Sequence, residues 1–473
     1  MHVLKIVFIV LEVLALFNVL IFVHELGHFL AARWRGLKIE RFAIWFGKPI
    51  WKTKLNGVEY CLGCIPAGGY VSLPQMATME VIEGKTEETQ EQLPPISAGD
   101  KIIVAFAGPL FSFLLALVFA LVVSGVGRPV SESETTTIIG YVFKDGPADK
   151  AGLRPGDKVL EIDGRPIKKF GGMGESVTWR VVSSEGPTVA VTVEREGQTL
   201  TFNPVPVKEP TKAWQRKSLR KIMISPAEKA VIYEVATNSP AFAAGLRKGD
   251  EIVRLNGEKV LHWAVIEERA EHHPEEPMTL LARREGKEFA VMIKPEAPAS
   301  PPDQKAQTGI LAWSGRADWK LVYPGPWEQV RDSVNAMVST FHALFSRKSD
   351  IKPQHLGGAV KIISVYYMLF DSEQGWRLAL WFSVLLNVNL ALLNLLPFPV
   401  LDGGHIVLAL VEAVRRKPVS ARILNVLQTA CAVLLIGYMA YIAFFDVQEL
   451  PWRNGKEKDA PAMKFEPKPE GAK

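Results

Sequence analysis

Long apolar runs alternate along this chain with stretches of ordinary soluble composition. Four runs are long enough to cross a bilayer as a helix, which takes about 20 residues. They cover residues 3–32, 102–126, 378–397 and 423–445, and the second and fourth contain no charged residue. The first run is too long for the core of a cleaved signal peptide, so we expect a retained helix there. The pattern predicts a polytopic α-helical membrane protein with four transmembrane helices.

Basic residues in the short loops predict the orientation of these helices. Seven Lys and Arg residues lie between positions 33 and 54, and four more lie between the third and fourth runs, at Arg415, Arg416, Lys417 and Arg422. At the N-terminal end of the first run, the only Lys or Arg is Lys5. Because short basic loops stay in the cytoplasm, we expect both termini and the long segment 127–375 on the outer side. In a Gram-negative cell that side is the periplasm.

The outer segment contains an internal repeat. Residues 146–167 read GPADKAGLRPGDKVLEIDGRPI and residues 239–260 read SPAFAAGLRKGDEIVRLNGEKV, with 9 of 22 positions identical. Each copy predicts a short helix ending at Gly152 or Gly245, then an apolar strand and a tight Asp-Gly or Asn-Gly turn. A repeat of this kind indicates two copies of one α+β module. The pattern resembles PDZ domains of the bacterial, protease-associated kind, which commonly capture peptides at a sheet edge. The alternative is a compact spacer without a ligand.

Composition shifts divide the chain further. A Pro-rich stretch at 294–307 predicts a linker, and apolar residues recur at helical spacing from Val330 to Leu344, which predicts an amphipathic helix. We therefore expect an N-terminal membrane part (1–126), a first PDZ domain (127–215), a second PDZ domain (216–298), a linker with an amphipathic helix (299–375), a C-terminal membrane part (376–452) and a disordered tail (453–473).

Overall composition excludes several classes of protein. The chain has 473 residues, 48% of them hydrophobic, which excludes disorder as its main state. Its 55 Lys and Arg against 50 Asp and Glu give a net charge of +5, too weak a bias to indicate nucleic acid binding. Three cysteines cannot form a disulfide framework. Cys61 and Cys64 have no second such pair or nearby His to complete a metal site, so we interpret both as inert strand residues.

The first apolar run carries the strongest chemical signal, an H-E-x-x-H motif at His24, Glu25 and His28. Residues four apart share one face of a helix, so both imidazoles can reach one metal ion, and Glu25 beside them can take a proton from metal-bound water. The alternative is a pair of interface histidines near a helix end. Because His and Glu are costly inside an apolar helix and are nearly always functional there, the motif predicts a metal site.

A catalytic zinc site needs a third protein ligand, and the third apolar run offers candidates. Pro397 and Pro399 interrupt this run, and a broken helix at membrane depth lines a cavity or is buried in protein. Asp402 follows the break and His405 comes three residues later. Spacing alone leaves both as candidate ligands, and Asp402 can also be read as a cap of the next helix.

Together, H-E-x-x-H in the first run and N-x-x-P-x-P-x-x-D-G in the third resemble the site-2 protease family of intramembrane zinc metalloproteases, and tandem PDZ modules between the second and third runs are similar to those of its RseP-type bacterial regulators. The resemblance implies a Zn²⁺ cofactor held by His24, His28 and Asp402, with Glu25 as general base and His405 as a neighbour. It also implies a multi-pass protein of the bacterial inner membrane, with its active site toward the cytoplasm.

Further segments support the same resemblance. Phe42–Leu73 is similar to the membrane-associated β-hairpin region of the family, and Asn56-Gly57 supplies its turn. Ser112 stands where the family often has Asn. Asn389 and Asn394 resemble polar residues that contact the substrate backbone, although helix–helix hydrogen bonding is an equal alternative.

The expected activity is cleavage of single-span membrane proteins in regulated intramembrane proteolysis and envelope stress signalling. By resemblance, the substrates are an anti-sigma factor trimmed beforehand by another, site-1-type protease, or remnant signal peptides, and the PDZ pair acts as a size filter. Two alternatives are a non-catalytic membrane scaffold and a metal transporter. The intact set of His24, Glu25, His28 and Asp402 argues against a scaffold. A transporter would explain neither Glu25 beside the histidines nor the peptide-binding modules.

Overall fold

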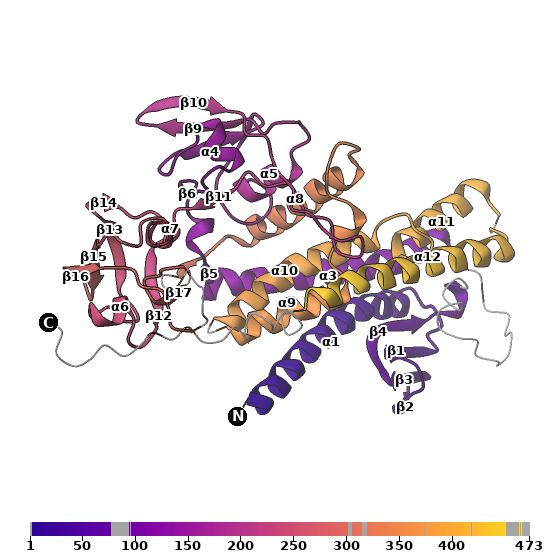
Figure 1. The fold of residues 1–473 in the computed structure, drawn as a ribbon. Helices are drawn as coiled ribbons and strands as arrows, with labels where there is room; N and C mark the ends of the chain where they lie inside the picture. The colour runs from indigo at the N-terminus through magenta and orange to yellow at the C-terminus, as the bar shows by residue number, and fades with distance from the viewer. Residues whose placement is uncertain are drawn as a thin grey trace. The chain divides into compact units, whose positions relative to one another are not determined.

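The computed structural model describes residues 2–76, 94, 96–300, 305–314, 319–372, 374–417, 419–450, 463 and 465 (Figure 1). The chain forms two compact units. One comprises Met1–Arg128, Tyr323–Val338 and Leu356–Gln448, and the other comprises Pro129–Val322, Ser339–His355 and Glu449–Lys473. The tail expected at 453–473 lies outside the described residues except for Met463 and Phe465.

The first unit is built from long apolar helices. Among the described residues, four helices are long and apolar enough to span a membrane, in agreement with the four predicted spans. They are α1 (His2–Trp34), α3 (Ala98–Val126), α10 (Gly375–Asn394) and α12 (Ala421–Gln448). Helix α3 packs against α1, α10 and the shorter α11 (Asp402–Arg415), so it forms the centre of this unit. Helix α9 (Ala359–Asp371) packs against α1, α10 and α12.

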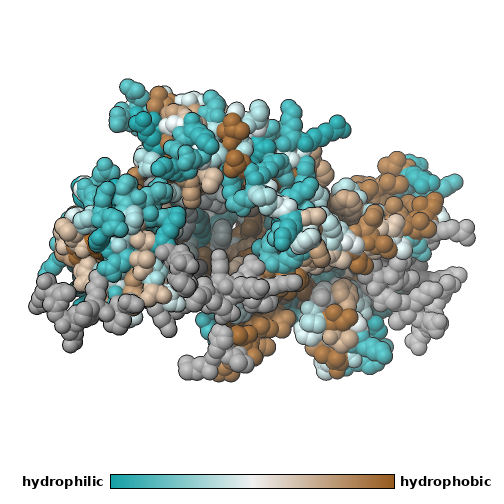
Figure 2. Space-filling model, in the orientation of Figure 1, coloured by the Kyte–Doolittle hydropathy of each residue, from teal (hydrophilic) through white to brown (hydrophobic). Residues whose placement is uncertain are grey.

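The surface of this unit is apolar where helices face outward. Figure 2 shows apolar side chains along α1 and at the end formed by α11 and α12, whereas polar residues cover most of the visible modules of the second unit. Leu4 and Leu434, for example, are 75% and 72% exposed. Faces of this kind are far larger than a soluble protein leaves to water, which is the arrangement expected of helices in contact with lipid.

The predicted hairpin region forms a four-stranded sheet. Its strands lie in the order β2-β3-β1-β4, and they are β1 (Arg41–Phe46), β2 (Trp51–Leu55), β3 (Val58–Leu62) and β4 (Ile65–Ser72). Asn56 and Gly57, with φ of 53° and 85°, form the tight turn between β2 and β3, as predicted. The region is larger than one hairpin because β1 pairs in parallel with β3 and antiparallel with β4.

The second unit contains two modules with the same order of elements. The first consists of β6 (Ile139–Val142), α4 (Pro147–Ala151), β7 (Lys158–Ile162), β8 (Arg165–Pro166), α5 (Val177–Ser183), β9 (Val191–Arg195), β10 (Gln198–Phe202) and β11 (Ile224–Pro226). The second consists of β12 (Ala230–Val235), α6 (Pro240–Ala243), β13 (Glu251–Leu255), β14 (Glu258–Lys259), α7 (Ala264–His272), β15 (Met278–Arg284), β16 (Lys287–Ile293) and β17 (Ile310–Ser314). Each module has its own buried apolar core.

Each module is completed by a strand beyond the boundary expected from sequence. Strand β11 pairs antiparallel with β6, and β17 pairs antiparallel with β12. Ile222 and Ile310 are buried in the two cores. The expected domain ends at residues 215 and 298 were based on changes in composition. Each folded core also includes apolar residues that lie in the sequence after a polar or Pro-rich stretch.

A buried Asp–Arg pair occupies the same place in both modules. The carboxylates of Asp157 and Asp250 are 1% and 0% exposed. Nε of Arg195 donates to Asp157 at 2.6 Å, and Nε of Arg284 donates to Asp250 at 2.7 Å. In each case a backbone N–H three residues earlier also donates to the carboxylate, at 2.8 Å. These bonds tie the loop after the short helix to the central strands.

Asp250→Ala is expected to destabilise the second module by about 2–3 kcal/mol, since it leaves a charged guanidinium without its buried partner. The loss is below that of a fully buried pair because the Arg284 side chain is 36% exposed and can be hydrated. Chemical unfolding of the full chain, followed by circular dichroism, measures it. Met292→Ala, at a 68% exposed position of β16, is the control. An Asp250→Ala transition that coincides with that of the control would contradict the prediction.

The remaining elements include the predicted amphipathic helix, which is α8 (Pro326–Phe345). Val330 is 2% exposed in a cluster with Ala116 of α3 and Val388 of α10, and Nε2 of Gln329 donates to the Ala120 carbonyl at 3.0 Å. The apolar face of this helix therefore packs against α3. Short elements complete the described chain: η1 (Pro74–Met76), β5 (Arg128–Val130), η2 (Glu132–Glu134), β18 (Lys320–Val322) and η3 (Pro353–His355).

Candidate metal and catalytic site

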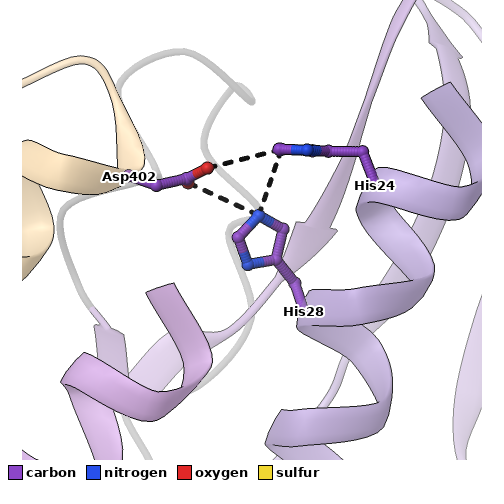
Figure 3. Close-up of side chains that lie close together, drawn as sticks. All are labelled: His24, His28 and Asp402. Atoms are coloured by element: carbon purple, nitrogen blue, oxygen red, sulfur yellow. Dashed lines mark hydrogen bonds and ion pairs between the residues drawn. The ribbon is translucent and has the colours of Figure 1, made fainter. Parts of the chain in front are cut away.

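The two histidines of the H-E-x-x-H motif lie one turn apart in α1 and face the same point. Both are buried, with exposures of 9% for His24 and 7% for His28. Their Nε2 atoms are 3.4 Å apart. Figure 3 shows the two rings converging with the carboxylate of Asp402, which comes from a distant part of the chain.

Helix α3 holds both rings through their other nitrogen. Nδ1 of His28 donates to the carbonyl oxygen of Val104 at 2.8 Å, and Nδ1 of His24 lies 2.9 Å from Oγ of Ser112. A carbonyl can only accept, so His28 carries its proton on Nδ1 and presents a lone pair on Nε2. The Ser112 hydroxyl can accept in the same way. Bonds of this type fix the tautomer and orientation of metal-binding histidines.

Asp402 reaches the histidines because the chain folds back sharply between α10 and α11. Helix α10 ends at Asn394, and α11 begins at Asp402. A Cβ at Gly403 would lie 2.2 Å from the Leu395 carbonyl oxygen, so this turn requires glycine. The two carboxylate oxygens of Asp402 lie 3.3 Å from Nε2 of His24 and 3.4 Å from Nε2 of His28.

These three side chains fit a single zinc ion. Tetrahedral zinc with bonds of about 2.0–2.1 Å places its ligand atoms about 3.3–3.4 Å apart. The 3.4 Å between the two Nε2 atoms matches this value, and each Nε2 has one Asp402 oxygen at a similar distance, Oδ2 at 3.3 Å from His24 and Oδ1 at 3.4 Å from His28. Oδ2 of Asp402 is buried without a hydrogen-bond partner, which costs free energy unless a cation faces it. Across the part of the chain that the structure describes, this is the one group of three such donors close enough to share an ion.

A cavity of about 300 Å³ opens beside these residues. Glu25 lines it next to the two histidines and Asp402, at 9% exposure. Strand β4 provides part of the wall, through Gly68, Gly69 and Tyr70. A Cβ at Gly69 would lie 3.0 Å from Cγ of Glu25, so this glycine permits β4 to approach α1 closely. The cavity places a carboxylate where it can contact water bound to the metal.

The other predicted site residues divide into those inside and outside the cavity. Asn394 lines the cavity, with Nδ2 at 3.5 Å from Nε2 of His24. Asn389 is not among the residues that line it. His405 also lines it, one turn into α11, but it is not part of the three-residue donor group.

The two cysteines of C-x-x-C lie apart from this site. Cys61 is buried on β3, with Sγ at 3.1 Å from Oε1 of Glu59, and Cys64 is exposed. Burial and the contact with Glu59 raise the pKa of the Cys61 thiol to about 11. A thiol that stays protonated is a poor metal ligand, which fits the interpretation of Cys61 as inert.

The sequence patterns did not indicate two residues of α3 that contact His28, Val104 and Gly108. Val104 acts through its backbone carbonyl, which no side-chain pattern reports. Gly108 lies against His28, where a Cβ would come within 2.1 Å of Nε2. The A-G-P segment at 107–109 was the available signal, because a glycine inside an apolar helix indicates a close approach.

Ser112→Ala is expected to lower zinc affinity by about 10- to 100-fold, because it removes the hydrogen bond that orients His24. Competition with a fluorescent zinc chelator measures the change in the purified protein. Ser124→Ala is the matched control, because the Ser124 hydroxyl lies on the same helix and bonds to the Ala120 carbonyl oxygen. Equal affinities for both variants would show that Ser112 does not position the ligand.

The sequence of this chain matches a known protein family. Residues 12–438 match the model of peptidase family M50. The chain is 30% identical over 454 residues to the regulator of sigma E protease of Salmonella typhi, covering 92% of this chain and 97% of that protein. It is 29% identical over 460 residues to the regulator of sigma-E protease RseP of Escherichia coli, with the same coverage. A Neisseria meningitidis protein whose name classes it with the zinc metalloproteases is 28% identical over 444 residues, covering 90% and 96%.

The family match spans more than half of the chain and contains His24, His28, Asp402 and Glu25. This membrane protein therefore belongs to peptidase family M50 and is a zinc metalloprotease of the site-2 type.

Proposed function

We propose that His24, His28 and Asp402 hold the zinc ion and that Glu25 is the general base of an intramembrane endopeptidase. One observation carries the proposal: two imidazoles on α1 and a carboxylate at the start of α11 meet with separations of 3.3–3.4 Å. A cavity lined by a second acidic side chain, that of Glu25, lies directly beside them.

A zinc ion held by these residues would polarise the scissile carbonyl and lower the pKa of its bound water. Glu25 accepts the proton from that water and returns it to the leaving amide nitrogen. Ser112 and the Val104 carbonyl keep the two imidazoles turned toward the site. Asn394, beside His24, offers its amide to the substrate backbone. Asn389, which does not line the cavity, is the weaker of the two substrate-contact candidates.

A transmembrane helix hides its peptide bonds in its own hydrogen bonds, so the substrate must unwind before cleavage. Strand β4 is the last strand of its sheet, and its Gly68, Gly69 and Tyr70 line the cavity. The free edge of a strand can pair with an extended segment. We therefore assign β4 the role of holding the unwound substrate beside Glu25.

The substrates we propose are single-span membrane proteins, such as an anti-sigma factor already trimmed by an upstream protease, or remnant signal peptides. Relatives named as regulators of the sigma-E protease type support a role in regulated intramembrane proteolysis and envelope stress. The basic loops support an inner-membrane topology with both termini and the modules in the periplasm and the active site toward the cytoplasm.

The two modules of the second unit are proposed to be PDZ domains that act as a size filter. Their common order of elements and the equivalent pairs Asp157–Arg195 and Asp250–Arg284 support one fold for both. A filter of this kind rejects substrates by steric clash with a bulky outer domain.

Two reporters that share one transmembrane segment test both parts of the proposal in liposomes. The reporter with a short outer segment is expected to be cleaved, and a folded outer domain is expected to slow cleavage by at least about tenfold. Deletion of residues 130–314, which removes both modules including β17, should bring the two rates together.

Zinc chelation followed by zinc addition is the control for the chemistry of the same assay. A scaffold or a transporter would leave both reporters intact, which would refute the protease site. Equal cleavage of both reporters by the complete protein would refute the filter alone.

A further inference from the structure

The second module contains a groove of about 420 Å³ that the catalytic chemistry does not use. It lies between α7 and β17, the last strand of its sheet. Trp263 and Trp313 stack at its side, with ring centroids 6.3 Å apart and an interplanar angle of 16°. Ile310 and Leu311 of β17 add further apolar surface. An open strand edge beside such a surface is suited to an extended peptide.

The C-terminal tail reaches this groove. Met463 is one of the residues that line it. Phe465 is only 6% exposed, and a Cβ at Gly309, directly before β17, would lie 3.3 Å from its ring atom Cε2. After Trp452 the sequence is dominated by charged residues, Pro, Gly and Ala, and Met463 and Phe465 are its two large apolar residues.

We infer that this groove is a peptide-binding site whose resident ligand is the C-terminal tail of the same chain, held through Met463 and Phe465. Two observations carry this inference. Met463 lines the groove, and Phe465 is buried beside Gly309, directly before β17, although a phenylalanine in a polar tail stays exposed unless it has a docking surface. The inference goes beyond the proposed protease function and does not depend on it.

The acidic wall of the groove indicates which peptides can bind there. The Glu267 carboxylate accepts hydrogen bonds from Nε1 of Trp313 at 3.2 Å and Oγ1 of Thr308 at 3.3 Å. Burial raises the pKa of Glu267 to about 7, so a positive charge on the ligand would stabilise its ionised form. The tail carries Lys464 between its two apolar residues. The class of ligand is therefore an extended peptide with two large apolar side chains two residues apart and a basic residue nearby.

A ligand tethered to the same chain competes with any other peptide for the groove. In the sequence, residues 449–462 lie between Gln448, the end of α12, and Met463. A short tether holds its ligand at an effective concentration of the order of mM. An external peptide of the same class must displace the tail, so its apparent affinity is lowered for as long as the tail is present.

The test is the binding of a fluorescent peptide, DAPAMKFEPKP (residues 459–469), to the full-length protein in detergent, measured by anisotropy. The double variant Met463→Ala and Phe465→Ala is expected to bind this peptide about tenfold or more tightly than the wild type, because its own tail no longer competes. Met292→Ala, on the opposite edge strand β16, is the matched control and should bind like the wild type.

Two results would overturn the inference. Equal affinity in the wild type and the double variant would show that the tail does not occupy the groove, and no binding in the double variant would show that the groove does not recognise this segment. A peptide with Phe465 replaced by Ala should fail to compete. Adding Leu311→Asp, at a 38% exposed position of the groove, should abolish binding. Retained binding would place the peptide elsewhere and refute the site.

Discussion

Replacing Glu25 by Gln is expected to lower the rate of reporter cleavage by a factor of about 10²–10⁴ while zinc stays bound. Glutamine has nearly the same size and still lines the cavity, but its amide cannot accept the proton of the attacking water. Glu25 is not one of the three converging donors, so its replacement leaves the metal ligands in place. The turnover rate in liposomes and the zinc content per chain are the two measurements.

Glu12→Gln is the matched control for this experiment, because Glu12 lies on the same helix and is not among the residues that line the cavity. It should cleave the reporter at the wild-type rate. A Glu25→Gln variant that retains zinc and cleaves within threefold of this control would exclude Glu25 as the general base. Loss of zinc from the same variant would instead assign Glu25 to the metal site.

Asp402→Ala is expected to lower zinc affinity by more than about 10²-fold, a larger effect than the loss of an orienting residue. Two imidazoles alone give an incomplete ligand set for zinc, and the carboxylate is the donor that lies 3.3–3.4 Å from both. Zinc content after dialysis against a weak chelator measures the loss. Reporter cleavage should disappear with it.

His405→Ala is the variant that distinguishes Asp402 from His405 as the third metal ligand. His405 lines the same cavity, and sequence spacing left it as a rival of Asp402. Its imidazole is not among the three converging donors, so His405→Ala should keep its zinc. The reverse pattern, with zinc lost from His405→Ala and retained by Asp402→Ala, would overturn the assigned ligand set.

Local patterns were sufficient for much of the architecture. The four spans could be predicted because the length of an apolar run is a property of the sequence alone. The turns at Asn56-Gly57, Asp163-Gly164 and Asn256-Gly257 could be predicted because both residues adopt positive φ, which few residue pairs tolerate. The helix with His24 and His28 followed from their spacing.

Long-range pairings were not visible in the same way. Strand β17 joins β12 across some 75 residues, and its five residues follow a Pro-rich stretch that resembles a linker. The parallel pairing of β1 with β3 likewise has no local signature. Composition therefore placed the ends of both modules before their last strands. The composition of a segment does not show which distant strand it pairs with.

By itself, the sequence determined that α1 would present two imidazoles and an acid in an apolar setting, because that arrangement depends only on residues within one helical turn. Tertiary structure decided the rest of the site. It brought the carboxylate of Asp402 within 3.4 Å of both imidazoles, whereas His405 lines the same cavity without joining this donor group. It also placed Ser112 and the Val104 carbonyl within hydrogen-bond distance of the other ring nitrogens. These contacts join residues far apart in the chain, so they depend on how helices pack and turns fold back, which no local pattern encodes.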